Sequence, residues 1–276
     1  MTIIQIGAAF STSLFAAVGL AGTAWLRLIA GAAIFLALRR PRLRGRSRRE
    51  LLGAVALGVN SGLMTLAFLE ALARLPLGTT VAIEFMGPLT VAVMGTRQLR
   101  RLAWPLLALA GVLALTEPWA GTVDLLGIGY AVGAGFGWAV YILLTARVGD
   151  KFEGLEGLSL TIPIAAVVAT ILAAPGAAAS VTVPVILGAI GLAFLMPVIP
   201  YSLELLALRR LTTSAFGTLM SLEPAIAALM GLIVLRQVPT PLQGLGVGLV
   251  VIAGVGATRG GHREAVTSEI SNTLAE

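Results

Sequence analysis

The chain has 276 residues, of which 58% are hydrophobic and only 12% are charged, and its mean hydropathy is +0.97. A soluble protein of this length needs far more charge to cover its surface, so lipid must be the solvent for most of the outer face. There is no cysteine, which excludes disulfides, thiolate metal sites and cysteine nucleophiles. The net charge of +6 has no basic soluble domain to carry it, which argues against nucleic-acid binding.

Apolar runs long enough to cross a bilayer follow one another from the first residues onward. A spanning helix needs about 20 apolar residues. Breaks at charges, Pro and Gly predict ten spans, near 3–20, 22–38, 51–73, 76–96, 103–119, 124–145, 156–174, 184–206, 212–235 and 240–258. No basic segment precedes the first run, so we interpret it as a span and not as a signal peptide. The polar residues 259–276 are predicted to be a disordered cytoplasmic tail.

The basic residues of the predicted loops lie almost entirely on one side. With the N-terminus inside, the outer loops hold only Arg74 and Arg236, whereas sixteen basic residues fall inside. The inner set is Arg39, Arg40, Arg42, Arg44, Arg46, Arg48, Arg49, Arg97, Arg100, Arg101, Arg147, Lys151, Arg209, Arg210, Arg259 and Arg263. The positive-inside rule therefore predicts that both termini are cytoplasmic, with the inner loops facing anionic lipid.

The chain also repeats itself at a shift of 136 residues. Segment 72–95 then aligns without gaps on 208–231, with Pro88 on Pro224 and Gly95 on Gly231. This predicts two five-helix repeats, 1–122 and 123–258, followed by the tail 259–276. An odd number of spans inverts the second repeat, which is typical of secondary transporters with a site at the repeat interface. The alternative is that apolar helices resemble one another by composition.

Residues that could support catalysis are scarce. The only histidine, His262, lies in the polar tail, and no phosphate-binding loop, metal-ligand cluster or Ser/His/Asp set is visible. We therefore expect a protein that is not an enzyme, with no catalytic residue, no metal and no cofactor.

Charged residues inside the predicted spans are the informative ones. They are Arg27, Glu70, Glu84, Glu204 and Glu223. Such residues are costly in lipid and usually face a substrate or proton pathway. Glu84 and Arg27 lie at similar depth and could pair, and Glu223 lies near the midplane. Glu70 and Glu204 lie near span ends, where a carboxylate solvated at the interface is as plausible as a functional one.

Roles follow from this placement. Glu84 and Glu223 are candidates for proton coupling, because a buried carboxylate holds a proton more readily than one in water. Arg27 either clamps a substrate carboxylate or forms a structural ion pair. Pro88 and Pro224 follow the two acids at equivalent repeat positions, so we expect paired helix kinks that act as hinges or only shape packing.

Four further polar or amphipathic residues are candidates for lining a substrate cavity: Asn60, Trp138, Tyr141 and Tyr201. Aromatic residues at span ends more often anchor the interface, but Trp138 and Tyr141 lie well inside the sixth span. Glycines at 129, 133 and 137 share one face of that span, and we interpret them as a close-packing seam.

Several strings resemble one family across about residues 3–258. They are "IQIGAAFSTSLFAAVGLAGTAWLRL", "LPLGTTVAIEFMGPLTVAVMGTR", "GWAVYILLTARVG" and "PYSLELLALRRLTTSAFGTLMSLEPAIAALMGL". The sequence is similar to the threonine/homoserine exporter group of the EamA-type drug/metabolite transporter superfamily.

The resemblance implies an all-α integral membrane protein of ten helices, in two inverted five-helix EamA repeats, in the bacterial inner membrane. It implies efflux of amino acids or related metabolites by proton antiport and alternating access, with Glu84, Trp138 and Glu223 near the substrate. The expected partners are this small molecule, protons and lipid, and the protein is either a monomer or a homodimer.

Two departures from the family pattern affect the substrate. Thr12 stands where many members carry lysine, and Arg236-Gln237 stands where repeats often carry Gly-Glu. A broader drug or metabolite exporter is therefore the alternative. A membrane sensor or enzyme is less consistent, since no output domain or catalytic cluster is visible.

Overall fold

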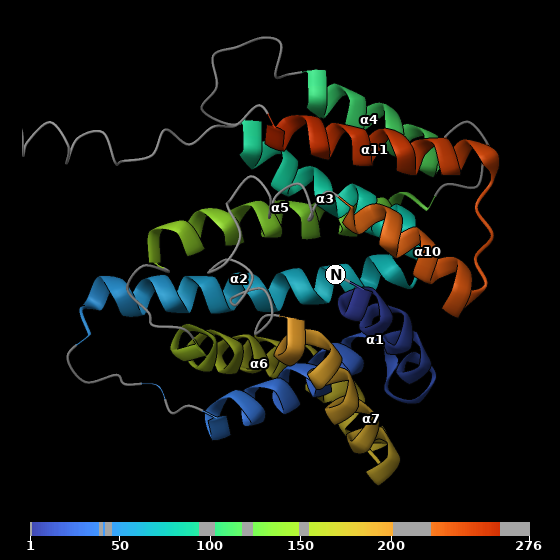
Figure 1. Cartoon of the computed structure of the whole chain (residues 1–276). Coiled ribbons are helices and arrows are strands. Elements are labelled where there is room, and N and C mark those ends of the chain that lie inside the picture. Colours follow the sequence, from blue (N-terminus) through green and yellow to red (C-terminus); the bar gives the residue numbers. More distant parts are fainter. Residues whose placement is uncertain are drawn as a thin grey trace, which may run out of the picture.

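A backbone surrounded by lipid has no water to bond to, so its segments must satisfy their own N–H and C=O groups as helices. The computed structural model describes residues 2–38, 41, 46–93, 103–117, 124–148, 155–200 and 222–259, and within these ranges the regular structure is entirely helical (Figure 1). The elements are α1 (Thr2–Leu38), α2 (Arg48–Leu72), α3 (Leu77–Val93), α4 (Ala103–Thr116), α5 (Leu125–Val148), α6 (Leu155–Ala177), η4 (Ala178–Ser180), α7 (Val183–Ala193), η5 (Phe194–Val198), α10 (Glu223–Leu235) and α11 (Pro241–Arg259). The all-helical prediction is confirmed.

Four stretches are long and apolar enough to cross a membrane, judged by length and composition: Ala16–Leu38, Arg48–Leu72, Leu125–Thr145 and Glu156–Ser180. Shorter apolar helices coincide with the predicted spans near 76–96, 103–119 and 240–258. Bulky side chains such as Phe136 (72% exposed) and Ile171 (70%) point outward, as lipid permits and water does not. The protein is thus a multi-pass membrane protein. The count of ten spans stays a prediction, because residues 201–221 lie outside the described ranges.

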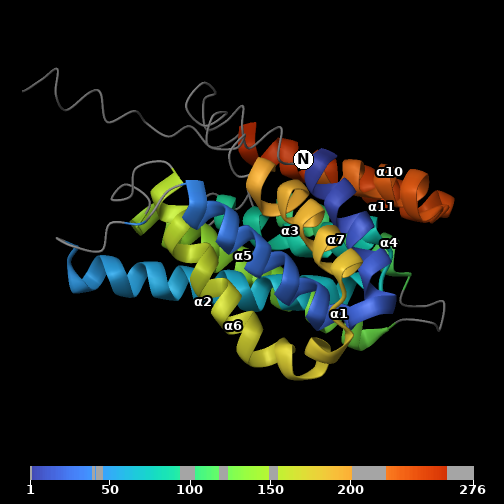
Figure 2. The same ribbon diagram turned by 90° about the horizontal axis from the view of Figure 1, so that it is seen from below.

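Helix α1 contains both of the first two predicted spans and breaks at Gly19. The φ of 71° and ψ of 178° at Gly19 lie in a region that residues with a Cβ rarely enter. Its two legs, residues 2–18 and 20–38, meet at an angle (Figure 2). In the part of the chain that the structure describes, nothing lies within 4 Å of a Cβ built at Gly19, so the need for glycine there is conformational and not a matter of space.

The helices pack in pairs that join distant parts of the chain. Helix α2 lies between α5 and α6, and α4 lies along α11 (Figure 1). Helix α3 packs on both α5 and α10, and α1 packs on α6 and α7. These contacts form three large apolar clusters, centred on Leu69 and Leu77, on Phe85 and Val250, and on Phe35 and Ala165.

Glycine lets several of these helices touch backbone to backbone. A Cβ at Gly111 of α4 would lie 2.7 Å from the carbonyl oxygen of Gly246, and one at Gly246 of α11 would lie 2.6 Å from that of Gly111. Helix α2 approaches α6 in the same way, where a Cβ at Gly58 would lie 2.8 Å from the carbonyl oxygen of Thr161. Close approach of this kind drives helix association where the hydrophobic effect is absent.

The predicted seam on α5 is wrong for two of its three glycines. Among the described residues, a Cβ at Gly129 or Gly133 would meet nothing within 4 Å, whereas one at Gly137 would contact Met64. The closest approaches on α5 instead involve Gly127 and Gly135, which lie on the face packed against α2 and α3. Spacing identified a shared face of the helix, but not which face the neighbouring helices occupy.

We expect Gly19→Ala to lower the thermal unfolding midpoint of the detergent-solubilised protein. Alanine must either enter the strained region, at on the order of 1–3 kcal/mol, or straighten the break between the legs of α1. Gly248→Ala is the matched control, because its Cβ also meets nothing within 4 Å but the residue is helical. Its midpoint should stay level or rise slightly. Equal midpoints for the two variants would contradict the account of the break.

Candidate functional site

Two buried carboxylates come together where α3 crosses α10. Glu84, on α3, is 9% exposed, and Glu223, the first residue of α10, is 3% exposed. The two helices pack on each other, so the two carboxylates lie on neighbouring helices. The sequence singled out both residues, and their proximity joins the two predicted repeats at one point.

The backbone of α5 sets the position of Glu84. A Cβ at Gly135 of α5 would lie 2.9 Å from the Glu84 carbonyl oxygen, and a Cβ at Gly87 would collide with the Gly135 carbonyl. Pro88 lies inside α3, as predicted, and has no N–H to donate to the Glu84 carbonyl one turn earlier. Glu84 therefore sits at a weakened turn that is pressed against a neighbouring backbone.

The second proline lies in a different setting. Pro224 falls in the first turn of α10, where a missing N–H costs little, and is fully buried. Within the described residues Pro224 lies at the start of a helix, and residues 201–221 before it lie outside the described ranges. The pair of equivalent mid-helix kinks therefore stays a prediction.

Arg27 lies on the second leg of α1 and is 2% exposed. Its Nη1 donates to the Sδ of Met196 at 3.4 Å. Met196 lies in the π segment η5, which directly follows α7, and it interrupts the helical backbone there with a φ of −165° and a ψ of 106°. The pairing of Arg27 with Glu84 stays a prediction. This break was not predicted from the sequence, although Pro197 after Met196 is a signal for one.

Of the remaining candidates, Asn60 joins α2 to α5. Asn60 Nδ2 donates to the carbonyl oxygen of Gly137 at 2.8 Å, so this amide links the two helices. Trp138 and Tyr141 follow on α5, and both are partly buried. Tyr201 lies outside the described residues.

The connection between α10 and α11 contains functional candidates that the sequence did not suggest. Gln237 Oε1 accepts the backbone N–H of Leu77, the first residue of α3, at 3.0 Å. Arg236 before it adopts a left-handed conformation, with a φ of 55°. Thr240 donates through Oγ1 to Oε1 of Glu117 at 2.8 Å. The only signal in the sequence was the departure at Arg236-Gln237.

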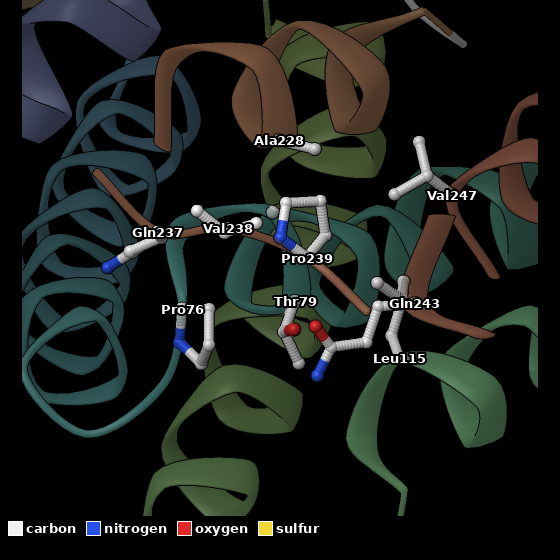
Figure 3. Close-up of a pocket in the computed structure, with 10 residues that line it drawn as sticks. Pro76, Thr79, Leu115, Ala228, Gln237, Val238, Pro239, Gln243 and Val247 are labelled. Atoms are coloured by element: carbon white, nitrogen blue, oxygen red, sulfur yellow. The ribbon is translucent and has the colours of Figure 1, made fainter. Parts of the chain in front are cut away.

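A small cavity lies beneath this connection (Figure 3). Its volume is about 60 Å³, and Thr79, Gln237 and Gln243 give it a polar side. Sites for small molecules usually measure about 300–1,000 Å³, so this cavity suits water and not an amino acid.

A partly exposed charge cluster occupies the end of α2. Arg74 Nη2 lies 3.9 Å from Glu70 Oε2, and Arg74 Nη1 lies 3.7 Å from Asp124 Oδ2. Its guanidinium also lies 5.9 Å from the centre of the Tyr130 ring. With side chains 26–38% exposed, these pairs contribute little to stability, and Glu70 is better understood as an interface carboxylate.

Three comparisons place the chain among known proteins. A profile of the EamA-like transporter family matches residues 125–258. The chain is 37% identical over 282 residues to the threonine/homoserine exporter RhtA of Escherichia coli (strain K12), covering 98% of this chain and 92% of the relative. It is also 37% identical over 276 residues to the protein of the same name from Salmonella typhimurium (strain LT2), covering 96% and 90%.

A solved crystal structure is similar in fold. It has a TM-score of 0.66 and 18% sequence identity, and the match covers 94% of each chain. An identity this low speaks for the fold alone. The similarity to the two exporters extends over nearly the whole chain, so this protein belongs to the EamA-like transporter family and is a membrane transporter, not an enzyme.

Proposed function

We propose that the protein is a secondary exporter of threonine, homoserine or closely related small amino acids across the bacterial inner membrane, with both termini cytoplasmic. The observation that carries the proposal is the 37% identity over 98% of the chain to relatives that are named as such exporters. The resemblance spans both halves, so it includes each element that brings Glu84 and Glu223 together.

The carboxylate pair is the proposed coupling site. A low-dielectric surrounding and a like charge nearby both favour the protonated form of a carboxylic acid. Glu84 and Glu223 are buried on helices that pack on each other, and we propose that they bind and release a proton together. Export in exchange for an incoming proton follows if substrate and proton compete for this pair.

An amino-acid substrate carries an ammonium group and a carboxylate. The carboxylates of Glu84 and Glu223 suit the ammonium group, and the guanidinium of Arg27 suits the carboxylate. We propose that Asn60, Trp138, Tyr141 and Tyr201 line the pathway. The helix break at Met196, beside Arg27, is the place where this lining can rearrange.

The packing pattern supports two inverted repeats that move against each other. The 136-residue shift relates α4 to α11 and α3 to the region of α10. The two members of each related pair also pack on each other, as expected for helices beside an axis that relates the two halves. Gly111 and Gly246 approach each other where α4 meets α11, one residue from the register of the 136-residue shift. We propose that alternating access occurs by rocking of these halves about the carboxylate pair.

Purified protein in proteoliposomes should move labelled threonine or homoserine against a pH gradient, and a protonophore should abolish the gradient-driven part. Leucine and a cationic dye serve as comparison substrates in the same vesicles. Dye flux without flux of any amino acid would replace the proposed substrate with that of a broader exporter.

Glu84→Gln and Glu223→Gln should each reduce gradient-driven export at least about tenfold, because the coupled proton site is lost. Exchange of labelled for unlabelled substrate at equal pH should be affected less. Glu70→Gln is the control, since Glu70 is a partly exposed carboxylate beside Arg74, and its export should match that of the wild type. Wild-type gradient dependence in both buried variants would refute the coupling role.

Gly135→Ala should impair export while the protein still folds. The new Cβ lies 2.9 Å from the Glu84 carbonyl oxygen, so α3 must shift and Glu84 with it. Gly133→Ala lies two residues away on the same helix, and its Cβ would meet none of the described residues within 4 Å, so this variant should export normally. Transport rates are compared at equal amounts of folded protein, measured by gel filtration. Equal rates for the two variants would contradict the packing argument.

A further inference from the structure

The first turn of α3 is capped by a side chain from the other half of the protein. The first N–H groups of any helix lack partners within the helix. At Leu77, which is fully buried, the partner is Gln237 Oε1, at 3.0 Å and 160 residues away. A buried helix start thus depends for one of its hydrogen bonds on the connection between α10 and α11.

That connection is held at both ends. The backbone N–H of Gln237 donates to the carbonyl oxygen of Gly231 at 3.0 Å, which ends α10 with Arg236 in its left-handed conformation. At the other end, Thr240 caps α11 by accepting the N–H of Gln243, and it also donates to Glu117 at the end of α4. The Gln237 side chain is therefore presented to α3 from a fixed backbone.

Behind Gln237 the two halves meet without room for a substrate. A Cβ at Gly78 of α3 would lie 2.9 Å from both the Cα and the Cβ of Ala228 on α10. The cavity beside Thr79 in this region has a volume of about 60 Å³, too small for an amino acid (Figure 3). Glu84 lies seven residues farther along α3, about 10 Å away at 1.5 Å per residue. The crossing therefore separates the carboxylate pair from this end of the bundle.

We propose that Gln237 is a positioning residue that latches the two halves together at the outer end, and that substrate leaves only when Gln237 releases α3. The proposal rests on the proposed function for the direction of transport and for which end faces outward. Water in the neighbouring cavity can replace the amide oxygen as acceptor for the Leu77 N–H, so release leaves no buried donor without a partner. A neutral amide also makes a weaker bond than a carboxylate does, so the latch opens readily and independently of pH.

The chain has no cysteine, so one introduced thiol can report on the latch. Thr79→Cys lines the cavity at a position that is 3% exposed, and Ala179→Cys lies exposed in η4, on the side predicted to face outward. Intact cells are treated with a membrane-impermeant maleimide, and labelling rates are compared in three backgrounds: Gln237, Gln237→Ala and Gln237→Glu. Thermal unfolding midpoints confirm that each variant is folded.

With Gln237 present, Thr79→Cys should react at least about tenfold more slowly than Ala179→Cys. Gln237→Ala should raise the rate at Thr79→Cys severalfold, and Gln237→Glu should lower it, because a carboxylate binds a helix start more tightly. The rate at Ala179→Cys should be the same in all three backgrounds. In transport assays, the Gln237→Glu variant should export substrate more slowly than the protein with Gln237.

An unchanged rate at Thr79→Cys in folded Gln237→Ala would overturn the latch. Labelling of Ala179→Cys only after permeabilisation would also overturn it, by placing this end inside. Labelling that responds to Gln237 while no amino acid is transported would support the latch and count against the proposed substrate alone.

Discussion

Direct contact between helix backbones is the interaction on which this structure depends. In lipid there is no hydrophobic driving force between helices, so they associate through close packing and polar contacts. Where α4 meets α11, and where α3 meets α5, glycine removes the side chain that would hold the backbones apart. Each of these contacts fixes the rotation of a helix, and so fixes which residues point inward.

The same contacts determine where charge can be placed. Glu84 is held by the α3–α5 contact at Gly135, and Glu223 lies on α10, which packs on α3. Two carboxylates in such a place destabilise the bundle unless protons or cations share the site. A structural role alone would favour apolar residues at both positions. The presence of two buried carboxylates here is consistent with proton exchange in the proposed export cycle.

Much of this could be predicted from the sequence, since lipid imposes a simple relation between apolar length and helix position. The predicted boundary between the first two spans lies beside the break at Gly19, and Glu84 and Glu223 stood out because charge is rare in spans. Rotation about a helix axis could not be predicted in the same way. The prediction of a packing seam at Gly129 and Gly133 was wrong, because the spacing of glycines shows that they share a helix face but not which helix packs against that face. The π segment at Met196 and the bond from Gln237 to Leu77 depend on partners far away in sequence.

The carboxylate pair and the Gln237 contact both lie along the crossing of α3 and α10. They differ in whether a proton can change their charge. Glu84 and Glu223 are acids in a region of low dielectric, so a proton changes the charge between the halves. Gln237 is neutral at any physiological pH, so a proton cannot act on it directly. In an exporter of the proposed kind, protonation of the carboxylate pair would change the position of α3. Because Gln237 also binds α3, this helix would carry the change to the outer end. Helix α3 is held at Leu77 and weakened at Pro88, and Glu84 lies between these two points. The helical segment from Leu77 to Glu84 can therefore move as a unit and carry a shift at Glu84 to the Gln237 contact.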